Sequence, residues 1–203
     1  TITFIANDKN GDVATGEQAR TIRIFAAFND EPTLTATGND PTFVQWGDPV
    51  GVFSSAVAST VESGQSITAM TLTVSNLRDG ASEVLRVDGA NIQLTDGFNV
   101  AITNNNNLGV SVAVTGTTAT VSFSGATLST ALLQTLIVDI TYSNSAVPPN
   151  TSNMGNRVVT ITSLTDDGSN SGLNDNINSS LAVASTVTVL IDTDGDGIGN
   201  NAD

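Results

Sequence analysis

Alternation of apolar and polar residues is the dominant pattern along this chain. Residues Ile67–Val74 read Ile-Thr-Ala-Met-Thr-Leu-Thr-Val, and the same two-residue period recurs at Val110–Val114, Ala119–Phe123 and Val158–Thr162. A period of two turns one face of a segment toward a core and the other toward water, which is typical of half-buried strands. The many valine, isoleucine and threonine residues also favour strands.

Turn signals separate these segments at short intervals. They are Asp79-Gly80, Asp88-Gly89, Asp96-Gly97, Thr115-Gly116 and Asp167-Gly168. Short strands with regular turns predict an all-β fold, an antiparallel β-sandwich from about 32 to 190 with no parallel sheet. The predicted inward positions are Leu72, Val74, Leu85, Val112, Val121, Ile140, Val159 and Ile161.

One segment departs from the alternating pattern. Leucines at 128, 132, 133 and 136 have the spacing of one helix face. We therefore expect one short helix near 128–136, followed by a strand at Ile137–Tyr142.

The two ends of the chain carry similar sequences. Thr1–Asp8 aligns with Thr160–Asp167, and Thr21–Ile24 aligns with Thr186–Val189. Each pair reads as strand, acidic loop, strand, so an internal repeat is indicated. This predicts a hairpin at 1–28 that belongs to a preceding or neighbouring module, one whole module at 29–190, and a loop or tail at 191–203.

Composition and charge narrow the possible functions. Six basic against twenty acidic residues give a net charge of −14, which disfavours nucleic-acid binding. The sequence has no histidine and no cysteine, so histidine triads, thiol nucleophiles and the usual zinc sites are excluded. Leu132–Ile140 is too short and polar to insert into a membrane.

Catalysis is not indicated by any motif of the sequence. Glu62, Glu83 and Asp139 are available carboxylates for glycoside hydrolysis, but no spacing selects two of them. Sugar-binding clefts usually also carry aromatic platforms, whereas we expect Trp46 and Tyr142 to be packing residues. The sequence therefore predicts a protein that is not an enzyme.

The strongest chemical motif lies near the carboxyl end. Asp192, Asp194, Asp196, Asn200 and Asp203 supply oxygen at positions 1, 3, 5, 9 and 12, with glycine at position 6. This is the ligand spacing of a calcium loop, so Ca²⁺ is the predicted cofactor. The segment resembles the thrombospondin type 3 repeat and, less closely, the EF-hand loop, because no helix is expected before it.

A second acidic cluster has part of this spacing. Asp8, Asn10 and Asp12 repeat positions 1, 3 and 5, but Val13 stands where the glycine would be. Both a calcium site and a plain hairpin loop are consistent with it. The sequence leaves the same two interpretations, metal ligands or solvated loop residues, for Asp166, Asp167, Asn174 and Asp175.

Three stretches carry a resemblance to the cadherin-like repeats of large bacterial surface adhesins. They are Asn29-Asp30-Glu31-Pro32-Thr33-Leu34, Leu132–Asn144 and Asn156–Gly168. The resemblance implies an extracellular β-sandwich of enlarged immunoglobulin-like or cadherin-like type at the bacterial cell surface, with calcium at the joints between modules. It makes Asn29, Asp30 and Glu31 candidate ligands, although the sequence alone is equally consistent with a polar linker.

These observations together predict a calcium-stabilised module of an adhesive or structural surface fibre, with neighbouring copies or modules of the same protein as its partners. One alternative is a subunit of an extracellular filament joined by strand donation between copies. A second alternative is an adhesin domain that binds a surface glycan or protein.

Overall fold

The computed structural model describes residues 28–151 and 156–200. The predicted hairpin at 1–28, with Asp8, Asn10 and Asp12, lies outside the described residues except for Phe28, and Asp203 lies outside them as well.

The described residues are mostly strands joined by turns, so the predicted all-β class is confirmed. They form β1 (Thr33–Gly38), β2 (Thr42–Val44), β3 (Val50–Gly51), β4 (Phe53–Ser59), β5 (Ile67–Ser75), β6 (Glu83–Val87), β7 (Ala90–Gln93), β8 (Asn99–Val100), β9 (Gly109–Thr115), β10 (Thr118–Ser124), β11 (Thr141–Asn144), β12 (Asn156–Asp166), β13 (Ile177–Asn178) and β14 (Val183–Leu190). A 3₁₀ turn spans Gly80–Ser82, and helix α1 spans Thr130–Val138.

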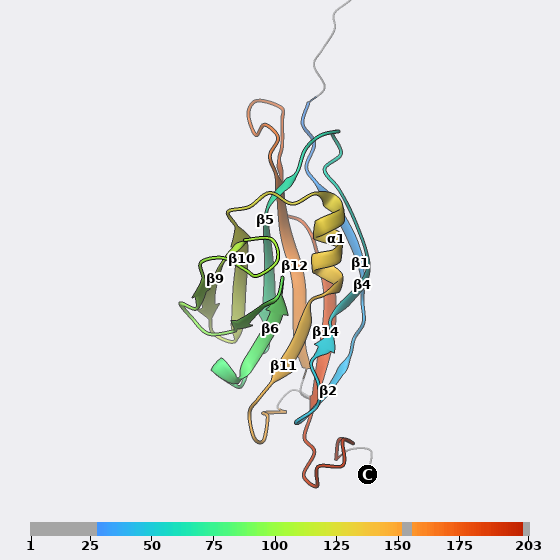
Figure 1. The fold of residues 1–203 in the computed structure, drawn as a ribbon, viewed down its shortest axis with the longest axis vertical. Coiled ribbons are helices and arrows are strands. Elements are labelled where there is room, and N and C mark those ends of the chain that lie inside the picture. The colour runs from blue at the N-terminus through green and yellow to red at the C-terminus, as the bar shows by residue number, and fades with distance from the viewer. Residues whose placement is uncertain (1–27, 152–155, 201–203) are drawn as a thin grey trace, which may run out of the picture.

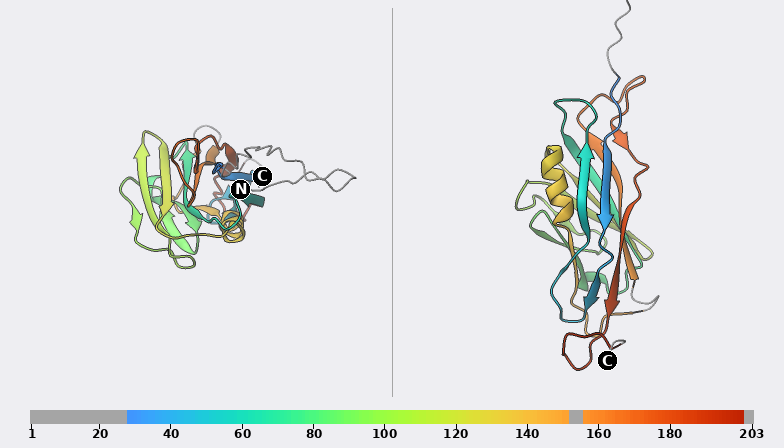
Figure 2. Two further views of the ribbon diagram at one scale, coloured as in Figure 1. Left: turned by 90° about the horizontal axis from the view of Figure 1, so that it is seen from above. Right: turned by 90° about the vertical axis from the view of Figure 1, so that its right-hand side faces the viewer.

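Three sheets build an elongated sandwich (Figure 1). The largest has the order β2-β14-β12-β5-β10-β9-β8, with β13 paired to β12. A second sheet has the order β3-β11-β6-β7, and β1 pairs with β4 alone. Helix α1 lies beside the β1–β4 pair on one flank of the molecule (Figure 2).

The predicted core is confirmed. All eight predicted inward residues are buried, with at most 4% of the side chain exposed, and they belong to one apolar cluster. Burying a side chain of this size is worth about 1.5–3 kcal/mol. The alternating pattern therefore identified the faces that hold the layers together.

A β-bulge at Thr162 interrupts the alternation of β12. Ile161 pairs with Leu72 and Ser163 with Thr71, which leaves Thr162 without an opposite residue. The Thr162 hydroxyl donates a hydrogen bond to the Thr71 carbonyl at 3.2 Å. Because a bulge shifts the alternation by one residue, the buried positions change from odd to even numbers, and Leu164 and Asp166 are buried beyond it.

The helix forms near its predicted place but is shifted by two residues. Leu128 precedes it and pairs with Ile67 in an isolated antiparallel bridge, while the Ser129 hydroxyl accepts a hydrogen bond from the Leu132 amide and caps the helix. The buried face is Leu133, Leu136 and Ile137, and Leu132 is 46% exposed. No helix of the described residues is long and apolar enough to cross a membrane.

Two predictions about strands were wrong. The strand expected at Ile137–Tyr142 begins only at Thr141, because the helix buries Ile137 in the core and continues through the exposed Val138, despite the branched side chains of both residues. The expectation of no parallel pairing fails at β2, which runs parallel to β14. This three-residue strand buries Phe43, whose ring meets Tyr142 edge-on at 5.9 Å between centroids.

Candidate functional site

The predicted calcium loop lies at one end of the sandwich, directly after β14 (Figure 1). Asp192 is buried, while Asp194 and Asp196 are exposed. One carboxylate oxygen from each of the three residues lies within 4.8 Å of the others. The structure therefore brings together three of the predicted ligands.

Backbone amides organise this loop around Asp192. The Gly195 amide donates to Asp192 Oδ1 at 2.7 Å and the Gly197 amide donates to Oδ2 at 2.9 Å. Gly195 has a φ of 77° and Gly197 a φ of 86°, a conformation that residues with a Cβ rarely adopt. Burial acts to raise the pKa of Asp192, but these hydrogen bonds outweigh it and lower the pKa below its ordinary value. Asp192 is therefore held ionised.

Asn200 and Gln45 attach the loop to itself and to the sandwich. Asn200 Oδ1 accepts hydrogen bonds from the Thr193 amide at 2.9 Å and from the Thr193 hydroxyl at 3.0 Å. The Asp192 amide donates to Gln45 Oε1 at 3.3 Å. The side-chain oxygen of Asn200 thus closes the loop, and the described contacts do not join it to the carboxylate cluster.

Trp46 borders the loop and is not a core residue. It is 58% exposed, which contradicts the packing role expected from the sequence. A Cβ on Gly195 would lie 3.9 Å from its ring atom Cζ3. Trp46 has a φ of 64°, so a tight turn directs the ring away from the core and toward the loop. Tyr142, by contrast, is fully buried, as expected.

The predicted linker site at the opposite end is built differently from the expectation. Only Asn29 turns inward; it is 6% exposed, whereas Asp30 is exposed and Glu31 is half-buried. The Asn29 amide donates to Asn174 Oδ1 at 2.7 Å, and Asn29 Nδ2 donates to the Asp175 carbonyl at 2.7 Å and to Asp166 Oδ1 at 3.5 Å. The residues that hydrogen-bond to Asn29 therefore come from the end of β12, from the loop between β12 and β13, and from Gln65 in the loop between β4 and β5.

Asp166 is the most deeply buried carboxylate at this end, with 1% of its surface exposed. Burial raises the pKa of Asp166 and outweighs the hydrogen bonds that it accepts from Gly168 and Asn29. The negative charges of Asp167 and Glu62 act in the same direction as burial. The sequence left Asp166 open as a ligand and did not select Glu62 or Gln65, which lie far away along the chain.

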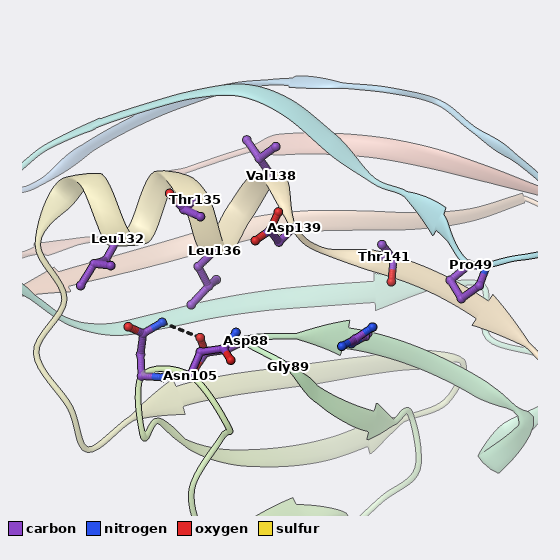
Figure 3. Close-up of a pocket in the computed structure, with 12 residues that line it drawn as sticks. Pro49, Asp88, Gly89, Asn105, Leu132, Thr135, Leu136, Val138, Asp139 and Thr141 are labelled. Atoms are coloured by element: carbon purple, nitrogen blue, oxygen red, sulfur yellow. Dashed lines mark hydrogen bonds between the residues drawn. The ribbon is translucent and has the colours of Figure 1, made fainter.

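A groove of about 560 Å³ separates α1 from the β6–β7 turn (Figure 3). Leu132, Thr135 and Val138 line its helix side, and Arg86 and Asp88 line the other. The carboxylate of Asp88 accepts hydrogen bonds from the Thr103 hydroxyl and from the amide and side chain of Asn106. Asp88 therefore fixes the turn at 104–106, and both of its carboxylate oxygens already accept hydrogen bonds from that turn and from Thr103.

The other carboxylates considered for catalysis lie in separate places. Glu83 is buried and accepts hydrogen bonds from the Tyr142 hydroxyl at 2.8 Å and from Arg157 Nε at 2.5 Å. Asp139 caps the carboxyl end of α1, and Glu62 lies in the loop between β4 and β5. In the described part of the chain these three residues belong to different elements, and no two of them share a hydrogen-bond partner.

Comparisons with protein-family models, with curated proteins and with solved structures found no match. The resemblance to cadherin-like adhesin repeats consequently stays a prediction from the residues quoted above.

Proposed function

We propose that this chain is a non-enzymatic, calcium-stabilised β-sandwich module of an extracellular fibre at a bacterial surface. The observation that carries the proposal is the cluster of Asp192, Asp194 and Asp196 at one end of an elongated sandwich. Three carboxylates held this close repel one another, and a bound divalent cation removes that repulsion. Calcium accepts flexible all-oxygen coordination, and extracellular modules bind it at about 10⁻⁴–10⁻³ M.

The path of the chain supports a role in an end-to-end assembly. The described chain enters at one end of the long axis and reaches the Asp192 loop at the other (Figure 1). Modules connected in this way follow one another in a line. A cation in the loop would then stiffen the segment through which one module leads to the next.

Exposed apolar side chains at both ends favour contacts between copies and so support the filament alternative. At the end that carries the Asp192 loop, Trp46 is 58% exposed and Ile198 is 48% exposed. Val61 and Leu173, in the loops beside Glu62 and Asn174, are 51% and 76% exposed. Sedimentation of the purified chain with calcium and with chelator separates a monomeric module from a self-assembling subunit.

The decisive experiment uses Trp46, the single tryptophan, as a reporter of the loop. Terbium, a luminescent stand-in for calcium, should be sensitised by Trp46 and displaced by calcium. Asp194→Asn with Asp196→Asn should abolish this signal while keeping the side-chain oxygens that accept backbone hydrogen bonds.

A matched control removes the same charge elsewhere. Asp48→Asn with Asp139→Asn changes two exposed carboxylates outside the loop and should leave the terbium signal intact. Sensitised luminescence that survives the Asp194 and Asp196 changes would refute calcium binding in this loop.

A further inference from the structure

Four buried side-chain oxygens in the described part of the chain have no hydrogen-bond partner, and all four gather at the Asn29 end of the sandwich. They are Glu62 Oε2, Gln65 Oε1, Asp166 Oδ2 and Asn176 Oδ1. Buried acceptors without partners are rare in folded proteins and indicate a missing donor, water or ion. Because the four oxygens lie at the same end of the sandwich, we look for a single group that would satisfy all of them.

Hydrogen bonds through the other atoms of these side chains tie them into one cluster. Gln65 Nε2 donates to Asn29 Oδ1 at 2.5 Å, and the neighbouring Asp30 amide donates to Glu62 Oε1 at 3.3 Å. Asp166 Oδ1 accepts from Asn29 Nδ2, and Asn176 Nδ2 donates to the Asp166 carbonyl at 3.1 Å. Each of the four side chains is therefore held through one polar atom, and its other polar atom, an oxygen, has no hydrogen-bond partner.

The charge of the cluster favours a cation over water alone. Glu62 and Asp166 are both carboxylates, and the electrostatic fields of Glu62 and Asp167 act on Asp166. The ion pairs of the described residues are made by Arg157, with Asp79 and Glu83, so they do not neutralise this cluster. Water donates hydrogen bonds but does not cancel the negative charges of the buried Asp166 and the half-buried Glu62.

We propose that Glu62, Gln65, Asp166 and Asn176 form a second calcium site, which fastens the entering chain at Asn29 and Asp30 to the loops between β4 and β5 and between β12 and β13. Two carboxylates and two amide oxygens are hard ligands of the kind that calcium prefers, and waters complete its coordination. The site extends the proposed calcium-stabilised module, but it shares no ligand with the Asp192 loop. Either site is able to bind without the other.

Binding should be measured on the full chain with the loop site removed. In the Asp194→Asn/Asp196→Asn background, calorimetric titration with calcium should still detect binding. Adding Glu62→Gln and Asp166→Asn should remove one binding site. Losing only a residue that supports a metal ligand weakens binding about 10–100-fold, so losing two carboxylate ligands should weaken calcium binding by at least about tenfold.

The matched control neutralises two nearby carboxylates that are not in the cluster. Asp30→Asn with Asp175→Asn should leave the number of sites unchanged; Asp175 Oδ1 accepts from the Ile177 amide, and asparagine keeps that acceptor. If the control loses the site and the Glu62/Asp166 variant keeps it, the ligands are the linker carboxylates and the proposal is wrong. If neither pair changes the binding, the cluster holds water only, and the proposal is equally wrong.

Thermal unfolding separates an ion site from a merely structural role. In chelator, Asp166→Asn should raise Tm relative to the unaltered chain, because it removes a buried charge without a cation. The rise in Tm on going from chelator to calcium should be smaller for Asp166→Asn than for the unaltered chain. An equal loss of Tm in both conditions would show a structural role only.

Gln65→Glu keeps the test valid if the Asp166 variant does not fold. Adding a third carboxylate to the cluster should lower Tm in chelator and tighten calcium binding. A Gln65→Glu chain that is destabilised equally with and without calcium would overturn the site. Because Trp46 lies beside the other loop, loss of tryptophan-sensitised terbium luminescence reports that loop, and the two sites therefore succeed or fail separately.

Discussion

Arg157 and Asp166 lie on the same strand, β12, and both are buried although their positions in the sequence differ by an odd number. A regular strand would place them on opposite faces. The bulge at Thr162 shifts the alternation between them and brings both charged side chains to buried positions. Because of this one β-bulge, both ends of β12 place a charged side chain in a buried position.

The two charges are balanced in different ways. Arg157 Nε lies 2.5 Å from Glu83 Oε1, and Arg157 Nη2 lies 2.9 Å from Asp79 Oδ2, so an ion-pair network compensates it. Asp166 is surrounded by amides and by further acids. The charge of Arg157 is compensated by carboxylates of the chain itself. At the Asp166 end of β12, by contrast, a cation from solution would stabilise the fold.

Calcium should stabilise the folded protein, and its removal should lower Tm. At a hundredfold excess over the dissociation constant, each site adds about 2.7 kcal/mol to the free energy of unfolding. Scanning calorimetry in calcium and in chelator measures the difference, and magnesium should not replace calcium fully because it demands strict octahedral geometry. A melting curve that is unchanged by chelator would contradict a structural role for calcium.

Leu133 and Leu132 provide a matched test of the helix packing. Leu133 is fully buried under α1, so Leu133→Ala should cost about 2–5 kcal/mol through lost contacts and a cavity. Leu132 is 46% exposed beside the groove, so Leu132→Ala should change stability by less than about 0.5 kcal/mol. Denaturant unfolding measures both, and similar losses for the two variants would mean that the helix buries another face.

Local sequence predicted the strands and their inward faces because alternation is a local signal. The β9 and β10 segments kept their predicted alternation, whereas β5 alternates regularly only from Met70, because the register shifts between Ile67 and Ala69. The predicted core residues on all three strands are buried. The leucine spacing predicted the helix but included Leu132, because local spacing does not reveal which side the sheets cover. The parallel pairing of β2 was not predicted, because a strand of three residues is too short to show an alternating pattern of apolar and polar residues.

The two candidate sites differ in the same way, because only one of them is formed by residues that are close in sequence. Asp192, Asp194 and Asp196 are neighbours in sequence, so their spacing predicted their proximity. Glu62 and Asp166 are distant in sequence and meet only through the fold, and the inward turn of Asp166 depends on the Thr162 bulge. No spacing in the sequence identifies such a pair.

The Arg157 network should be costly to break and less costly to neutralise. Arg157→Met leaves Glu83 buried without its cation, which should cost about 3–5 kcal/mol. Adding Glu83→Gln and Asp79→Asn to Arg157→Met should recover part of that loss, because no buried charge is then left. Arg86→Met, on the exposed face of β6, is the control and should have little effect. An Arg157→Met chain as stable as the control would refute the compensating role of this arginine.

Tyr142 should make the protein sensitive to alkaline pH. Its hydroxyl donates to Glu83 Oε1 at 2.8 Å, and burial, together with the negative charge of Glu83, raises the pKa of Tyr142 far above its ordinary value of 10.0. Arg157 acts in the opposite direction but does not offset these effects. Above pH 10.0 the unfolded chain therefore releases a proton that the folded chain retains, and stability falls as pH rises.

Tyr142 is the single tyrosine, so phenolate absorbance follows this one group. The absorbance should appear together with the loss of β-sheet circular dichroism, because the buried hydroxyl ionises only when the core opens. Tyr142→Phe should lower stability at neutral pH by about 0.5–1.5 kcal/mol through the lost hydrogen bond, and it should flatten the decline above pH 10.0. Phenolate formation in a chain whose circular dichroism is still intact would mean that Tyr142 reaches solvent in the folded state and that the core around Glu83 is open.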